Sequence, residues 1–205
     1  ALANYYSTVI ISADSRQFYK ELSIGTAKPS PAEQQGIRHY FIDSHSVLED
    51  VSASMYEKEV RTILEDEFNV HDTVIMVGGS GLFVDAVCHG LDDIPTSKEL
   101  RTGILNEIER DGLDKLRAEL KEKDPEYYNE VDLENPVRII RAIEVIRLTG
   151  QKYSILRNAS KRVNPFELKR FIIEHPREQL YARINTRVDQ MMASGLLHEV
   201  KSVIQ

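Results

Sequence analysis

The sequence predicts an α/β fold, with a mostly parallel sheet flanked by helices and an all-helical insertion within the chain. Three short apolar runs rich in β-branched residues, at 8–12, 40–42 and 73–77, end in polar residues or glycine, which is typical of buried strands. Residues 52–68, between the second and third runs, carry apolar side chains at helical spacing. From residue 97 to 150, helical patterns follow one another and interrupt the alternation of strand and helix.

Capping residues mark helix boundaries in the first part of the chain. Ser30, Pro31 and Glu33 predict a helix start, because a serine can accept a free N–H group and proline suits the first turn. Ser52 is available as the N-cap of the helix at 52–68. Strands that alternate with helices in this way predict parallel strand pairing.

Residues 97–164 are expected to form the helical insertion. Pro136 suits the first turn of a helix and Gly150 suits its end. The sheet-containing core would then be discontinuous in sequence, comprising residues 1–96 and 165–205. The helix that follows Pro136 is expected to bury a stripe formed by Ile139, Ile143 and Ile146.

The chain is expected to return to the sheet after the insertion. Residues 171–173 (FII) predict a fourth strand, and residues 176–195 predict a helix. Residues 196–205 predict an amphipathic helix without a stop signal, and residues 1–7 have the pattern of the last turns of a helix. We therefore expect further chain at both ends. The apolar stripe of the helix at 176–195 comprises Leu180, Ile184, Val188 and Met191.

Composition excludes several classes of protein. The 205 residues are 41% hydrophobic and 29% charged, which is too mixed for disorder, and no run approaches the roughly 20 apolar residues of a membrane span. The N-terminus lacks a signal-peptide pattern, and the single cysteine, Cys88, excludes an intrachain disulfide and a multi-cysteine zinc site. The six histidines lack metal-ligand spacing. We expect a cytoplasmic protein without membrane contact.

The charge is unevenly distributed along the chain. A net charge of −7 argues against a protein that coats nucleic acid indiscriminately. Residues 138–170 nevertheless contain nine basic and only two acidic residues. Such a segment can attract a polyanion locally, or it can be a solvated helix face followed by a charged loop. Charge alone leaves both interpretations open.

The first motif follows the first predicted strand. Asp14, Ser15, Arg16 and Gln17 lie at its carboxyl end, the edge at which open α/β sheets bind ligands. Asp14 is therefore a candidate general base or metal-supporting carboxylate, and the alternative is an N-cap of the next turn. The segment SIGTAKPS that follows adds a backbone turn and one cation, Lys28.

The second motif follows the third predicted strand. Gly78 and Gly79 let the backbone approach a ligand, and the helix that begins near Ser80 could hold phosphate oxygens with its free N–H groups. The alternative is a tight strand-to-helix turn capped by Ser80. The sequence contains no Walker A pattern.

Two pairs of arginines complete the candidates. Arg138 and Arg141 project together from one predicted helix and suit phosphates or guanine edges, although a salt bridge with Glu144 is the alternative. Arg183 and Arg187 are spaced i,i+4, and Arg187 could reach into a cleft or extend its charge to solvent.

Six ordered blocks resemble the tRNA dimethylallyltransferases, also called tRNA isopentenyltransferases. The blocks are ISADSRQFYKELSIGTAKPS, HYFID, VGGSGLFVDAV, the arginine of IPTSKELR, NPVRIIRAIEVI and PREQLYARINTRVDQMMASGL. The resemblance implies a P-loop-type α/β core and a helical insertion that grips the tRNA anticodon stem-loop. It also implies transfer of a dimethylallyl group from dimethylallyl diphosphate to N6 of the adenosine beside the anticodon, with Mg²⁺ accompanying the diphosphate.

The resemblance assigns chemical roles to a few side chains. Asp14 matches the family aspartate proposed as the general base at N6, which requires hydrogen-bond reach of the amine. Arg187 matches the arginine thought to stabilise the leaving diphosphate, with Arg183 as a weaker candidate for the same group.

The resemblance also implies contacts with the tRNA substrate. The stretch from Asp14 to Gln17 would handle a base extracted from its stack, and Ser80 and Arg101 would contact the tRNA. A further stretch matches at Val137, Arg138, Ile139, Ile140 and Arg141, where valine replaces a frequent glutamine.

Two family regions are not found in the sequence. These are the phosphate-binding loop that should precede residue 1 and the basic C-terminal helical region. We therefore expect no metal site within the chain itself, because the Mg²⁺ site should need that loop. We expect the family activity for the parent protein, weak or no turnover for this chain alone, and a monomer.

Three alternatives remain open. An adenylate isopentenyltransferase would use a free nucleotide, a P-loop small-molecule kinase would share the helical periodicity, and a non-catalytic RNA-binding module would need no phosphate-binding loop. The basic segment and the DSRQ motif favour tRNA as the acceptor.

Overall fold

The structure is a computed structural model that describes residues 1–91, 94–157 and 164–204. The chain divides into two compact units, the first formed by Ala1–Leu91 with Val163–Gln205 and the second by Asp92–Arg162. The predicted insertion, 97–164, overlaps the second unit, and its residues 158–163 lie outside the described part of the chain. No helix among the described residues has the length and apolar character of a membrane span.

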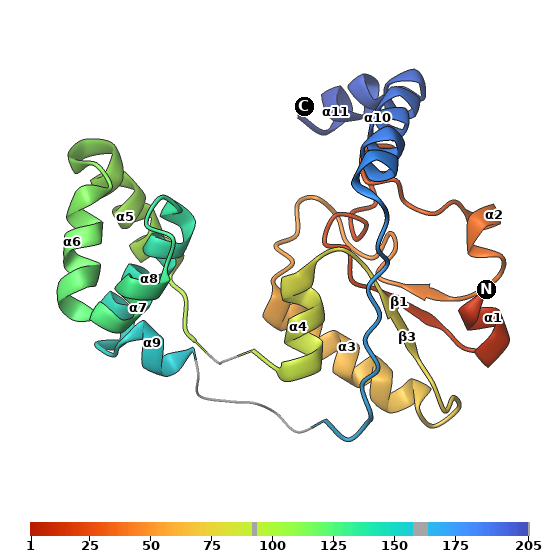
Figure 1. Cartoon of the computed structure of the whole chain (residues 1–205), viewed down its shortest axis with the longest axis horizontal. Coiled ribbons are helices and arrows are strands. Elements are labelled where there is room, and N and C mark those ends of the chain that lie inside the picture. Colours follow the sequence, from red (N-terminus) through yellow and green to blue (C-terminus); the bar gives the residue numbers. More distant parts are fainter. Residues whose placement is uncertain (92–93, 158–163, 205) are drawn as a thin grey trace. The chain divides into compact units, whose positions relative to one another are not determined.

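The first unit contains a three-stranded parallel sheet in the order β2-β1-β3 (Figure 1). Its strands are β1 (Ile10–Ser12), β2 (His39–Tyr40) and β3 (Ile75–Val77). Ile10 pairs with His39 on one side and Ile75 on the other, so β1 is the central strand. The mixed α/β class and the first three predicted strands are thereby confirmed.

The second strand ends earlier than the sequence predicts. Phe41 and Asp43 adopt positive φ angles of 63° and 54°, which turn the backbone out of the extended conformation directly after Tyr40. Positive φ is uncommon for residues other than glycine, and the strand pattern of Tyr40–Ile42 carries no signal for it.

Two helices begin where the capping residues predict. Ser30 forms a capping box with Glu33, and Ser52 accepts a hydrogen bond from the Met55 N–H at 3.1 Å. Helices α3 and α4 pack against each other (Figure 1). The helices of this part are α1 (Leu2–Tyr6), α2 (Pro31–Gln34), α3 (Ala53–Glu67) and α4 (Gly81–His89).

An aromatic core lies between the sheet and α3. Phe18 and Tyr56 are stacked with ring centroids 5.4 Å apart, and Phe41 packs on Tyr56 at 4.6 Å. The Tyr56 hydroxyl donates to the Ser12 carbonyl oxygen at 2.9 Å. Helix α3 is therefore joined to the carboxyl end of β1, where the candidate site begins.

The predicted fourth strand is wrong. Phe171, Ile172 and Ile173 adopt no strand, and their side chains are 84–87% exposed. A strand is defined by ladder hydrogen bonds, and these residues do not pair with any strand of the described sheet.

The last two helices form where predicted, but the apolar stripe of the first is not buried. Helix α10 (Arg177–Ala193) contacts α11 (Leu196–Ile204). Leu180, Ile184 and Val188 remain 44–48% exposed. Helical periodicity predicts which residues share a face, but it does not supply the surface that covers that face.

The second unit is a helical bundle built around α8 (Pro136–Thr149). Asn135 caps its start and Gly150, at φ 70°, ends it. The predicted stripe is confirmed, because Ile139, Ile143 and Ile146 are buried. The other helices are α5 (Lys98–Asp111), α6 (Asp114–Lys123), α7 (Pro125–Glu130) and α9 (Tyr153–Leu156).

We predict that Gly78→Ala lowers the free energy of unfolding by about 3 kcal/mol, as overpacking does in tight contacts. A Cβ atom at Gly78 would lie 2.2 Å from the carbonyl carbon of Ala13, so β1 and β3 would have to separate. The matched control is Gly79→Ala, where a Cβ atom would meet nothing within 4 Å. Urea denaturation checks both variants, and equal stabilities would contradict the account.

Candidate functional site

The ends of β1 and β3 meet through their backbones. The Ala13 N–H donates to the Val77 carbonyl oxygen at 2.8 Å, and the Ser80 N–H donates to the Ala13 carbonyl oxygen at 3.1 Å. Because Gly78 has no side chain, its Cα can lie against Ala13. The two predicted motifs therefore come together at the carboxyl edge of the sheet.

Two serines join these motifs. The Ser80 hydroxyl accepts a hydrogen bond from the Ser15 N–H at 2.9 Å and donates to the Ser15 hydroxyl at 3.0 Å. Ser80 is the residue before α4, but its side chain does not cap that helix. The alternative of a turn capped by the Ser80 side chain is therefore wrong, because the hydroxyl bonds across to the first motif instead.

Asp14 is half-buried beside this serine pair. Its Oδ1 accepts a hydrogen bond from the Arg16 N–H at 2.9 Å, which closes the turn that follows β1. The predicted turn-capping contact is thus present, and it uses one of the two carboxylate oxygens. A carboxylate has two acceptor oxygens, so Oδ2 can accept a hydrogen bond from a second donor.

The Gln17 side chain points into the loop at 23–27. Its Nε2 donates to the carbonyl oxygens of Thr26 and Ala27 at 3.3 and 3.4 Å. Arg16, between Asp14 and Gln17 in sequence, is exposed. Of the four residues in the first motif, Gln17 therefore holds the neighbouring loop, whereas Arg16 faces solvent.

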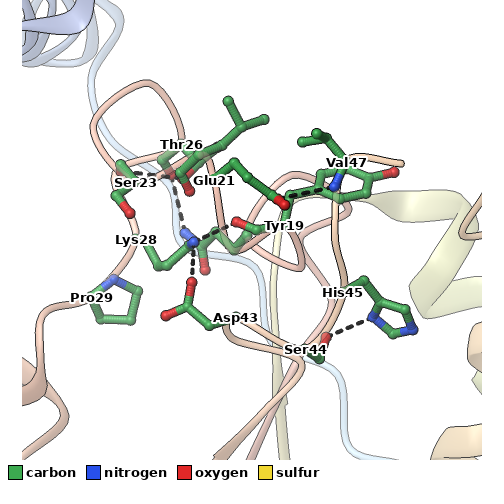
Figure 2. Close-up of polar contacts among 12 residues, drawn as sticks. Tyr19, Glu21, Ser23, Thr26, Lys28, Pro29, Asp43, Ser44, His45 and Val47 are labelled. Atoms are coloured by element: carbon green, nitrogen blue, oxygen red, sulfur yellow. Dashed lines mark hydrogen bonds and ion pairs between the residues drawn. The ribbon is translucent and has the colours of Figure 1, made fainter. Parts of the chain in front are cut away.

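Lys28 anchors the same loop from inside (Figure 2). Its Nζ donates to the Tyr19 carbonyl oxygen at 2.6 Å and to the Asp43 carboxylate, and its side chain is only 4% exposed. The cation that the sequence suggested for SIGTAKPS is therefore used within the fold, and Asp43 follows β2 with the positive φ described above.

Glu199 closes the loop from the other side. Its carboxylate accepts hydrogen bonds from the N–H groups of Ser23 and Ile24, both at 2.7 Å, and of Gly25 at 2.9 Å. Burial alone would raise the pKa of Glu199, but these three donors and nearby Lys28 outweigh it and lower the pKa below its ordinary value. Glu199 is 174 residues from Gly25 in sequence, and no motif indicated the contact.

The two arginines of α10 are exposed. Nη1 of Arg183 lies 2.8 Å from Nε2 of His175, and the Arg187 side chain faces solvent. Within the described residues, neither arginine makes a hydrogen bond or ion pair with Asp14. Their proposed contact with a diphosphate therefore stays a prediction.

Glu144 organises the arginines of the second unit. It accepts hydrogen bonds from Arg101 at 2.7 Å, from Arg141 at 3.2 Å and from the Ser97 N–H at 2.9 Å. Arg141 also donates to the carbonyl oxygens of residues 94–95 at 3.0 and 3.1 Å. The salt-bridge alternative for Arg141 is thus present. Burial would raise the pKa of Glu144, but the arginines and the N–H group together lower it.

Only part of the predicted tRNA-contacting stretch is at the surface. Val137 and Arg138 are exposed at the first turn of α8, whereas Ile139 and Ile140 are buried in the helical core. Two of the predicted basic residues, Lys161 and Arg162, lie outside the described residues. Arg138 is therefore the cation of this stretch that is best exposed to a polyanion.

Clusters of side chains commonly hold metal ions in proteins. The described residues contain no group of three or more histidine, cysteine, aspartate or glutamate side chains that could hold a metal ion. Mg²⁺ usually keeps several waters and is held by one or two carboxylates together with substrate phosphates.

Comparisons with known proteins agree on one family. The model of the IPP transferase family matches residues 17–205. The chain is 47% identical over 203 residues to tRNA dimethylallyltransferase 1 of Bacteroides fragilis, covering 98% of this chain and 67% of that protein. It is 46% identical to tRNA dimethylallyltransferase of Cytophaga hutchinsonii, covering 100% of this chain and 68% of that protein.

Solved structures give the same result. The chain is similar to the crystal structure of a tRNA isopentenylpyrophosphate transferase from Bacillus halodurans, with a TM-score of 0.63, 31% identity and coverage of 99% of this chain and 63% of that one. It is also similar to a eukaryotic dimethylallyltransferase acting on tRNA, with a TM-score of 0.77, 25% identity and coverage of 99% of this chain and 51% of that one.

These neighbours are P-loop-like proteins, which agrees with the fold class that the sequence predicts. The chain spans about two thirds of the length of the curated relatives. With a family model that matches nearly all of its residues and relatives above 40% identity, the chain belongs to the IPP transferase family.

Proposed function

We propose that the protein transfers a dimethylallyl group from dimethylallyl diphosphate to N6 of the adenosine next to the anticodon in tRNA. The observation that carries the proposal is the half-buried Asp14 carboxylate at the sheet edge, in a chain of this family. The similarity to proteins named tRNA dimethylallyltransferases supports tRNA as the acceptor.

The reaction needs a base at N6. The N6 lone pair attacks C1 of the dimethylallyl group while the bond from C1 to the diphosphate oxygen breaks, and N6 loses a proton. Asp14 accepts that proton through Oδ2, while Oδ1 keeps its hydrogen bond to the Arg16 N–H. The adenine must leave the RNA stack for N6 to reach Asp14, and Ser15, Arg16 and Ser80 are the neighbouring groups that would contact it.

Negative charge develops on the diphosphate as the bond breaks. We propose that Arg187, with Arg183 beside it on α10, meets that charge. Because tRNA prenyltransferases commonly use a divalent metal, we further propose that Mg²⁺ accompanies the diphosphate. Because Mg²⁺ is usually held by one or two carboxylates with waters and substrate phosphates, the diphosphate itself would supply part of its coordination.

We propose that the second unit binds the anticodon stem-loop. Arg138 at the exposed first turn of α8 and Arg101, whose side chain is 48% exposed, can reach phosphates. Val137 lies beside Arg138 on the same exposed turn. Ile139, Ile140 and the salt-bridged Arg141 would act by supporting that surface.

A transfer assay with the complete protein tests this function. Labelled dimethylallyl diphosphate is offered with an anticodon stem-loop RNA, with AMP or with no acceptor. We expect label on the stem-loop alone. Label on AMP would favour an adenylate isopentenyltransferase, ATP-dependent phosphorylation a kinase, and RNA binding without transfer a non-catalytic module, and each of these results would contradict the proposal.

We predict that Asp14→Asn lowers the single-turnover rate about 10²- to 10⁴-fold, because the general base is lost. Asparagine retains an oxygen for the Arg16 N–H, so the melting temperature and tRNA affinity should stay unchanged. Asp72→Asn, at an exposed position away from the site, is the control. A full rate in Asp14→Asn would remove the base assignment.

Arg138 and Arg141 should respond differently to alanine. We predict that Arg138→Ala reduces the slope of log affinity for the stem-loop against log salt concentration by about 1 and leaves stability unchanged. Arg141→Ala should lower the free energy of unfolding by about 1–3 kcal/mol, because the buried Glu144 carboxylate loses one of its partners. Equal stabilities of the two variants in urea denaturation would contradict this distinction.

A further inference from the structure

One carboxylate holds three consecutive backbone N–H groups. Both oxygens of Glu199 are used, Oε2 by Ser23 and Ile24 and Oε1 by Gly25. Charge-assisted hydrogen bonds of this kind are about twice as strong as neutral ones. Gly25 lies so close to α11 that a Cβ atom there would be 3.0 Å from the Leu196 side chain.

The loop held by Glu199 is also held from the Asp14 side. Gln17 donates to the carbonyl oxygens of Thr26 and Ala27, directly after the residues that Glu199 binds. The Gln17 N–H in turn donates to the Asp14 carbonyl oxygen at 3.1 Å. The loop at 23–27 therefore lies between the candidate base and α11.

Helix α11 links the loop at 23–27 to α10. The two helices contact each other, and α10 bears Arg187 but has no buried residue. A helix without buried side chains depends on its neighbours for a fixed position. Glu199 and Leu196 of α11 contact the loop beside Asp14.

We propose that Glu199 is a positioning residue for the transfer reaction. By holding α11 on the loop at 23–27, it fixes the helix that bears Arg187 relative to Asp14, so that the leaving diphosphate and the base are aligned together. This inference rests on the proposed function, since it assigns Arg187 and Asp14 to the same reaction.

Amide hydrogen exchange tests the contact without reference to activity. In Glu199→Gln, an amide NH₂ replaces one acceptor, so the exchange of Ser23, Ile24 and Gly25 should become about tenfold faster or more. The control is Glu178→Gln on the exposed first turn of α10, which should leave these rates unchanged. Unchanged exchange in Glu199→Gln would overturn the proposal.

A kinetic cycle tests the positioning role in the complete protein. Glu199→Gln should lower kcat about tenfold with little change in KM for the stem-loop RNA, and it should have almost no further effect in an Arg187→Ala background. Fully additive effects would overturn the proposal. An Arg187→Ala variant with normal kcat would instead count against the proposed function, and the exchange measurement would still report on the contact.

A second variant keeps the proposal testable if Glu199→Gln does not fold. Gly25→Ala adds a Cβ atom 3.0 Å from the Leu196 side chain and 3.4 Å from Oε1 of Glu199, without changing any charge. It should loosen the same contact, with smaller changes of amide exchange and kcat in the same directions. Unchanged values for both measurements would overturn the proposal.

Discussion

The close approach of Gly78 to the Ala13 backbone is the constraint on which the candidate site depends. It brings the ends of β1 and β3 together, and only then can the Ser80 hydroxyl bond to both the N–H and the hydroxyl of Ser15. Asp14, one residue before Ser15, owes its place at the sheet edge to the same contact. Backbone packing therefore brings the two segments of the site together, and the hydrogen bonds of Ser80 to Ser15 then join them.

Two carboxylates, one in each unit, organise the surroundings by the same physical means. Glu144 gathers two arginines and one N–H group, and Glu199 gathers three N–H groups. In both cases burial opposes the charged form, and the donors outweigh it, so that the pKa is lowered. A carboxylate that accepts this many hydrogen bonds fixes the segments that carry the donors. For Glu199, that segment is the loop at 23–27 beside Asp14.

Local signals predicted much of this fold. Caps at Ser30 and Ser52, the buried stripe of α8 and the first three strands depend on residues near one another in sequence.

The predictions that failed concern partners that are distant in sequence. Residues 171–173 have a strand pattern but do not join the described sheet, and the α10 stripe has no covering surface among the described residues. Glu199 was missed because its partners are N–H groups, which every residue other than proline possesses. The sequence did place Asp14 and Ser80 at one edge, because parallel strands end on the same side.

The central claim is that Asp14 meets N6 of the substrate adenine. A structure of the complete protein bound to an anticodon stem-loop and a non-reactive diphosphate analogue tests it directly. The account predicts N6 about 2.6–3.2 Å from one carboxylate oxygen of Asp14, with the other oxygen still bonded to the Arg16 N–H. An adenine that remains stacked in the RNA, or an N6 amine bound by other groups beyond hydrogen-bond reach of Asp14, would contradict it.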